Sequence, residues 1–109
     1  MAKKVRRTQS VIKRSDAEKF LAKVPEQNVF WVNDGRVLGD MRELAEALAN
    51  MSDETFAYHC NEVRKDFSNW LRDIIKDEAL AKELEKPLTR TEAAKTVAER
   101  VALLSSTLK

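Results

Sequence analysis

Apolar side chains recur at helical spacing along most of this chain, and each run follows a residue that can cap a helix. Ser15 with Glu18 forms a capping-box pattern, and the apolar positions behind it predict a short helix over residues 16–24. Asp40 with Glu43 repeats the pattern, and the stripe that follows predicts a helix to about residue 50. Two helices are therefore expected, separated by the segment between residues 24 and 40.

The middle of the chain predicts two further helices. Ser52 can cap the first of these helices. A polar stretch follows its apolar residues, so the sequence does not define the residue at which this helix ends. Its apolar stripe consists of Phe56, Cys60 and Val63. Asp66 is expected to cap the second, which is the most regular amphipathic helix in the chain. The expected faces are Phe67, Trp70, Leu71 and Ile74 inward, with Ser68, Asn69, Arg72, Asp73 and Lys76 outward.

The last third of the chain predicts two helices separated by a proline. Asp77 can cap the first, and Pro87 ends it because proline cannot continue a helix. Thr89 and Glu92 form another capping box before the second. The second helix carries a narrow heptad-like seam of Ala94, Val97, Val101, Leu104 and Leu108. Two uses of this seam are open: packing against the hairpin described next, and pairing with a second copy in a homodimer.

A small β-hairpin is predicted over residues 29–38, between the first two helices. Residues 29–32 are rich in strand-forming side chains, and residues 33–36 can turn with positive φ at their Asp-Gly pair. An isolated hairpin is marginal in water, so its apolar face is expected to lie on helices. Because alternate side chains face opposite sides, one of Phe30 and Trp31 must point outward, and that residue is the candidate for stacking on a base.

These elements predict a mainly α fold of five or six short helices packed with one β-hairpin. The 109 residues suit one domain, and 35% charged residues with 43% apolar ones and only two Gly and two Pro favour helices. We expect residues 1–14 to form a mobile basic tail, because no apolar periodicity ties them to a core. Residues 15–109 are expected to form a single compact domain.

Charge is divided unevenly between these two parts. Residues 1–14 carry six cations and no acidic side chain, which leaves 14 of the 20 Lys and Arg against all 18 Asp and Glu in the rest. The tail is therefore +6 and the body −4, although the net charge is +2. Such a segment can hold nucleic acid by releasing the counterions condensed on it. The expected contacts are Lys3, Lys4, Arg6, Arg7, Lys13 and Arg14.

Few groups in the sequence suit catalysis or metal binding. His59 is the only histidine and Cys60 the only cysteine, so neither a disulfide nor a metal site within one subunit is expected. As neighbours in a helix they point about 100° apart, which opposes a nucleophile–base pair. Carboxylates are abundant without a sign of burial, and two glycines do not suffice for a phosphate-binding loop. We therefore expect no enzyme activity, no cofactor and no metal.

Location is indicated by the lone cysteine and by the lack of apolar runs. A single cysteine fits a reducing compartment. The basic N-terminus is not followed by a signal-peptide apolar region, and no 18 apolar residues run together. A cytoplasmic protein without a membrane partner is therefore expected.

A composite pattern covers residues 28–84. It runs through a glycine-containing hairpin, a Glu-Leu-Ala helix, and His-x-Asn and Asp-Phe-x-x-Trp segments. The matching residues are Gly35, Glu43-Leu44-Ala45, Phe56, Tyr58-His59, Asn61, Asp66-Phe67, Asn69-Trp70, Asp73, Asp77-Glu78 and Leu80-Ala81. In this pattern the chain resembles a small domain of unknown function found mainly in archaeal proteins, with Lys65 where that domain has Asn. The resemblance implies the fold and brings no established activity, substrate or catalytic residue.

The same residues also have a purely structural explanation. Asp66 can cap a helix, and Phe67 and Trp70 can fill the core. His59 and Asn61 can satisfy backbone groups where one helix breaks before the next. The pattern can therefore serve the fold without serving a reaction.

Three function classes remain after this reading. The leading prediction is a non-enzymatic nucleic-acid or ribonucleoprotein binder that uses the cationic tail. The alternative is a protein–protein interaction module with an exposed helical surface. The third is a small enzyme whose site is shared between the subunits of a homo-oligomer.

Overall fold

The computed structural model describes residues 12–109, and residues 1–11 lie outside the described part. The described residues form six α-helices and one antiparallel β-hairpin, which confirms the predicted fold class. The helices are α2 (Arg14–Leu21), α3 (Met41–Asn50), α4 (Asp53–His59), α5 (Asp66–Trp70), α6 (Glu78–Glu83) and α7 (Arg90–Thr107). The shorter elements are the 3₁₀ turn η1 (Glu26–Asn28), strands β1 (Phe30–Trp31) and β2 (Val37–Leu38), and the π-helical turn η2 (Leu71–Ile75).

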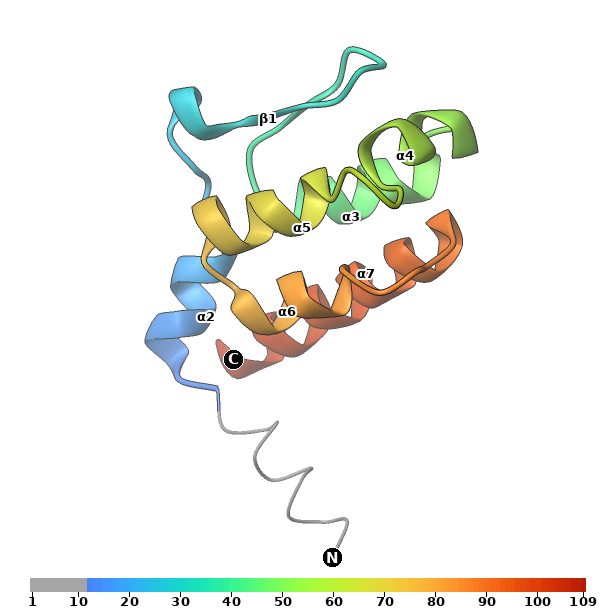
Figure 1. The fold of residues 1–109 in the computed structure, drawn as a ribbon. Helices are drawn as coiled ribbons and strands as arrows, with labels where there is room; N and C mark the ends of the chain where they lie inside the picture. The colour runs from blue at the N-terminus through green and yellow to red at the C-terminus, as the bar shows by residue number, and fades with distance from the viewer. Residues whose placement is uncertain (1–11) are drawn as a thin grey trace, which may run out of the picture.

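The longest helix, α7, organises the packing. It lies along α3, and its C-terminal end lies beside α2 (Figure 1). The helix α5 continues into η2, and both pack on α6. Figure 1 shows the hairpin across one end of the molecule, with α5 between it and the layer of α6 and α7. The hairpin packs on α3 through β2 and on α5 through the Phe30 ring.

The hairpin packs on the helices through its inward aromatic residue. The ring of Phe30 stacks on Phe67 with centroids 5.1 Å apart and meets Trp70 edge-on at 5.8 Å. Trp31 is the outward residue, with 70% of its surface exposed. The turn has one positive φ, at Gly35 (102°), and not the two positive φ values that the Asp-Gly pair could supply.

Four of the predicted helix caps are confirmed. Their side chains each accept a hydrogen bond from the backbone N–H three residues further on, and the cap residues are Asp40, Ser52, Asp77 and Thr89. Glu92 completes the capping box at the start of α7. A cap of this kind stabilises a helix by about 1 kcal/mol.

The boundaries of α2 differ from the prediction. The N-cap is Lys13, which makes no side-chain capping bond, and Ser15 lies inside the helix. The helix ends at Leu21 because the Val24 N–H donates to the Gly39 carbonyl at 2.8 Å and draws the chain into an extended path. A long-range backbone bond therefore overrides the local helical stripe.

The inward face of α5 and η2 differs from the prediction at two positions, the first of which is Ile74. Phe67, Trp70 and Leu71 are buried as predicted, but Ile75 takes the place expected for Ile74. The reason is the π turn, in which each hydrogen bond spans five residues instead of four and moves the next inward position by one residue.

A second correction on this helix concerns Ser68, which was expected to face outward. It is buried, and its hydroxyl donates to the Ala81 carbonyl at 2.7 Å. The contact arises because α6 packs on that side of α5.

Two further apolar stripes also differ from the prediction. The helix α4 ends at His59, and Val63 lies in the following loop with 90% of its surface exposed. The seam of α7 packs on α3 and α2 instead of on the hairpin, and its residues Val97 and Leu104 are fully buried. Pairing of two copies through this seam would require those two side chains to leave the core.

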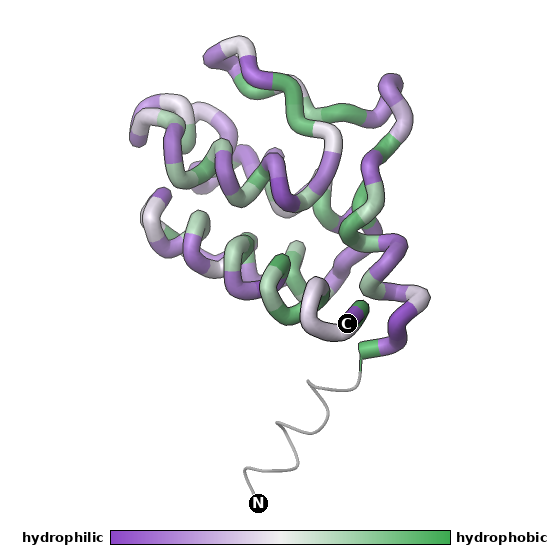
Figure 2. The backbone as a smooth tube through the Cα atoms, turned by 180° about the vertical axis from the view of Figure 1, so that it is seen from behind, coloured by the Kyte–Doolittle hydropathy of each residue, from purple (hydrophilic) through white to green (hydrophobic). Residues whose placement is uncertain are grey.

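The hydropathy of the described chain follows its secondary structure. Apolar and polar residues alternate around the helices, so that none is apolar along its whole length (Figure 2). Within residues 12–109, no helix has the length and apolar character required to cross a membrane.

Candidate functional site

The structure describes two of the six predicted nucleic-acid contacts. Lys13 and Arg14 are both exposed at the start of α2. The Arg14 guanidinium lies 3.8 Å from the Glu18 carboxylate, a long and exposed ion pair. The other four contacts lie outside the described residues, and they are Lys3, Lys4, Arg6 and Arg7.

Both ring nitrogens of His59 are engaged in hydrogen bonds that link three segments of the chain. Its Nε2 accepts from the Asn33 backbone N–H at 3.0 Å, and its Nδ1 lies 2.9 Å from the Asp66 carboxylate. Because a backbone N–H can only donate, Nε2 is the acceptor and Nδ1 carries the ring proton. The side chain is buried, with 4% of its surface exposed. Neither nitrogen is therefore open to a substrate or a metal ion.

Asp66 belongs to the same network and does not cap α5 as predicted. It is the first residue of the helix, and the N-cap is Lys65, which makes no side-chain capping bond. One Asp66 oxygen contacts both His59 Nδ1 and Arg64 Nη2, the latter at 2.7 Å. The Arg64 guanidinium in turn lies 4.3 Å from the centre of the Tyr58 ring. The carboxylate is therefore used to orient neighbouring side chains.

Trp70 makes the second hydrogen bond to the segment that holds the hairpin. Its Nε1–H donates to the Asn28 carbonyl at 2.8 Å. With His59 and Asp66 it forms what we call the hairpin clamp, a set of three side chains that bind the hairpin to α4 and α5. The Asp-Phe-x-x-Trp and His segments of the sequence therefore have a structural role.

Asn61 and Cys60 have structural environments as well. The Asn61 side chain donates to the Ala57 carbonyl and accepts from the backbone N–H groups of Val63 and Arg64, all at 2.8–2.9 Å. It therefore satisfies backbone groups where α4 ends, as predicted. Burial raises the pKa of the half-buried Cys60 thiol, which keeps it protonated and unreactive at neutral pH.

A buried ion pair joins α6 and α7, and sequence reasoning missed it. Asp77 has 1% of its surface exposed, and its two oxygens accept from Arg100 Nε at 2.7 Å and Nη2 at 2.9 Å. Asp77 also caps α6 through the Leu80 N–H at 3.2 Å. The two partners are 23 positions apart in the sequence, so no local pattern signals this pair. It fixes α6 on α7.

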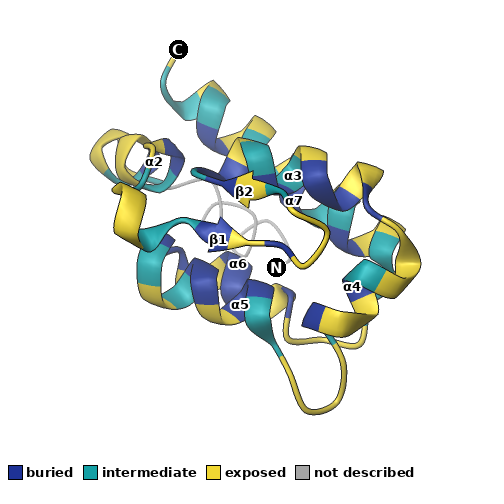
Figure 3. Cartoon of the chain, turned by 90° about the horizontal axis from the view of Figure 1, so that it is seen from above, coloured by how far each residue is buried: buried dark blue, intermediate teal, exposed yellow. Residues whose placement is uncertain are grey.

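The exposed surface of the hairpin carries two large apolar side chains. Trp31 and Val37 are cross-strand partners with 70% and 44% of their surfaces exposed, and we call this pair the hairpin face. Figure 3 shows exposed and buried residues alternating along both strands. An open hollow of about 430 Å³ lies next to it, lined by Trp31, Arg64 and Asp73 among others.

The described residues provide no metal-binding cluster. Between residues 12 and 109, no three His, Cys, Asp or Glu side chains come together in an arrangement that could hold an ion. Comparison of the chain with protein-family models, with curated proteins and with solved structures finds no match. The resemblance to the archaeal domain therefore stays a prediction.

Proposed function

We propose that the protein binds nucleic acid, alone or within a ribonucleoprotein, and catalyses no reaction. The cationic side chains of residues 1–14 contact the phosphates. One observation carries the proposal: fourteen residues hold a charge of +6, while the rest of the chain is −4. A cationic segment on an acidic body concentrates the attraction for a polyanion in one place.

The buried polar groups of the described part serve the fold. The buried polar and charged residues there are Asp40, His59, Ser68 and Asp77. Each is engaged by the fold: two as helix caps, one in the hairpin clamp, and one in a bond between α5 and α6. Their chemistry is used to fix secondary structure elements in place.

The proposal predicts binding that weakens steeply with salt. At most six phosphates are neutralised by the segment, so log K is expected to fall with log salt with a slope no steeper than roughly −5 for duplex DNA. Electrophoretic mobility shifts with generic DNA and RNA between about 50 and 200 mM salt measure that slope. Affinity that does not change across this range would remove the electrostatic mechanism.

A second candidate function is a protein–protein interaction module, and the hairpin face is the observation that favours it. Exposed tryptophans are frequent centres of protein interfaces because they bury a large apolar area with few rotatable bonds. The exposed apolar pair lies on strands, so the surface differs from the helical one that the sequence predicted. The partner would be a protein that covers Trp31 with apolar side chains.

This second function is tested by capture from nuclease-treated lysate of the native cells. A partner retained by the wild-type protein and lost with Trp31→Ala would support it, provided that the variant keeps its melting temperature. Val63→Ala is the matched control, because that apolar side chain is 90% exposed in the loop after α4 and does not belong to the hairpin. A partner retained equally by all three proteins would contradict docking at the hairpin face.

A further inference from the structure

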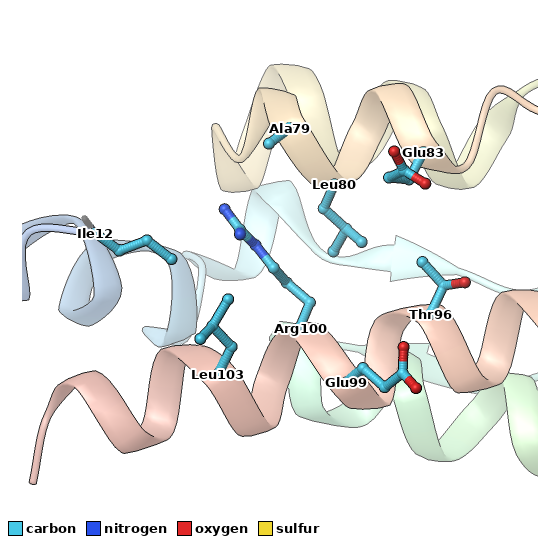
Figure 4. A pocket seen from close by; sticks show the side chains of 8 residues that line it. All are labelled: Ile12, Ala79, Leu80, Glu83, Thr96, Glu99, Arg100 and Leu103. Carbon is cyan, nitrogen blue, oxygen red and sulfur yellow. The ribbon is translucent and has the colours of Figure 1, made fainter. Parts of the chain in front are cut away.

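A groove of about 600 Å³ lies between α6 and α7, close to the point where the described chain begins (Figure 4). Its apolar lining consists of Ile12, Ala79, Leu80 and Leu103. Its polar lining consists of Glu83, Thr96, Glu99 and Arg100. Leu103 has 38% of its surface exposed, which is high for a leucine beside a core. The groove therefore offers apolar walls with carboxylates among them.

The electrostatic character of the groove is set by its two glutamates. Arg100 is already neutralised by Asp77 through two hydrogen bonds of 2.7 and 2.9 Å. Glu83 is engaged at its edge by Lys86, with an N–O distance of 3.2 Å, and Glu99 is exposed on α7. The groove is therefore net negative and suits a cationic occupant with some apolar side chains.

The position of Ile12 indicates which occupant lies within reach. Ile12 lines the groove and packs against the core, and it is the first residue that the structure describes, directly after residues 1–11 in the sequence. In Figure 4, Ile12 and Leu103 stand toward one end of the groove, and Glu83 and Thr96 stand toward the other. The distance along α7 from Leu103 to Thr96 is about 10 Å at 1.5 Å per residue.

Residues 1–11 have both the length and the composition to fill this space. An extended chain spans about 3.3 Å per residue, so the four cations that precede Ile12 by five to nine residues can reach both glutamates. Val5 and Val11 supply apolar side chains in the same segment. Attachment to the groove wall also gives the segment an effective concentration in the millimolar range.

We propose that residues 1–11 dock in the α6–α7 groove of their own chain, with Lys3, Lys4, Arg6 and Arg7 near Glu83 and Glu99. Docking withholds these cations from phosphates, so the groove competes with nucleic acid for the same segment. That competition rests on the proposed function, whereas the docking itself does not.

The docking is tested without nucleic acid by NMR of the full chain. A variant with Lys3, Lys4, Arg6 and Arg7 changed to Gln is expected to shift the amide resonances of Ala79, Glu83, Thr96 and Glu99, and to leave those of Trp31 and Val37 unchanged. Unchanged groove resonances would overturn the proposal. Shifts that grow with protein concentration would also overturn it, because the occupant would then be the segment of a second copy.

Tryptic cleavage within residues 1–11 gives an independent test. The double variant Glu83→Gln, Glu99→Gln removes two exposed ion pairs, and the rate of cleavage is expected to rise about two- to tenfold. The matched control is Glu46→Gln, Glu62→Gln, which removes the same charge from exposed positions on α3 and in the loop after α4. Equal rates in the two double variants would contradict docking in this groove.

The consequence for binding is measured separately. If docking competes with nucleic acid, the groove variant is expected to bind RNA about two- to tenfold more tightly than the control variant, by the same release of the segment. A groove variant that releases the segment in the cleavage assay while no variant binds RNA would contradict the proposed function and leave docking supported. Tighter binding without faster cleavage would contradict docking and leave the proposed function supported.

Discussion

His59 shows how one buried side chain can hold three segments of this small protein together. It belongs to α4, its Nε2 accepts from the hairpin at Asn33, and its Nδ1 contacts Asp66 in α5. Asn33 and Asp66 are 26 and 7 positions away from His59 in the sequence. Because a two-stranded hairpin is only marginally stable by itself, these bonds help to hold it on the helices. The only histidine in the chain is therefore explained by the fold.

The two tryptophans are expected to respond oppositely to alanine. Trp70 has 6% of its surface exposed and donates to Asn28, so Trp70→Ala is expected to lower the free energy of unfolding by about 3–5 kcal/mol. Trp31 is 70% exposed, and Trp31→Ala is expected to change it by no more than about 0.5 kcal/mol. Urea denaturation measures both. Equal losses would contradict the inward and outward assignment.

Glu43 is expected to make stability depend on pH on the acid side. Its hydrogen bonds from Lys23 and from the Gly39 N–H hold the pKa of the carboxyl below its ordinary value of 4.5. Its stabilising contribution is therefore complete above the unfolded pKa and is lost as the pH falls through the lower folded pKa. The wild-type advantage over Glu43→Gln in urea denaturation is expected at pH 7 and absent well below about pH 4. An advantage that is the same at both ends would exclude this linkage.

At the level of single residues, the sequence predicts which way a side chain faces better than it predicts which residues that side chain contacts. The alternation of side chains in a strand predicts that Phe30 or Trp31 faces outward, and the structure identifies Trp31. Cap residues such as Thr89 are predictable because donor and acceptor are three residues apart. The Asp77–Arg100 pair is not, because it exists only when α6 meets α7.

Among the elements, η2 is the one that breaks the regular pattern. Its final turn is closed by two N–H groups, from Lys76 and Asp77, which both bond to the Leu71 carbonyl. Lys76 has φ 77°, which places a side chain in the left-handed region where glycine is preferred. The sequence shows no glycine there, so local signals predict an ordinary helix and place Ile74 inward instead of Ile75.

This geometry predicts that glycine stabilises the end of η2. Lys76→Gly is expected to raise the free energy of unfolding by about 0.5–1 kcal/mol, since the steric cost of a left-handed lysine outweighs the greater chain entropy of glycine in the unfolded state. Lys82→Gly in α6 is the matched control and is expected to lower it by about 1 kcal/mol. Thermal unfolding distinguishes the two. Destabilisation by both substitutions would contradict the strained conformation of Lys76.

For the whole molecule, helix packing and charge distribution serve different ends. The helix α7 packs against α3, α2 and α6, and the buried residues of its apolar seam contact other helices of the same chain. The helices were predictable from periodicity, and the hairpin from its strand-forming residues and Asp-Gly turn. The packing partner of α7 was not predictable, because a seam does not specify what covers it. Under the proposed function, residues 1–14 bind the nucleic acid and the acidic body supplies the fold.

The most direct test of the proposed function is one titration with a charge-neutralised variant of the 109-residue chain. The six cations Lys3, Lys4, Arg6, Arg7, Lys13 and Arg14 are changed to Gln, and circular dichroism checks that helicity is unchanged. Fluorescence anisotropy with labelled RNA and duplex DNA is then recorded at about 100 mM salt for wild type and variant. The account predicts an affinity loss of at least about tenfold with the fold intact. Retained affinity would place the binding site in the folded body and contradict the account.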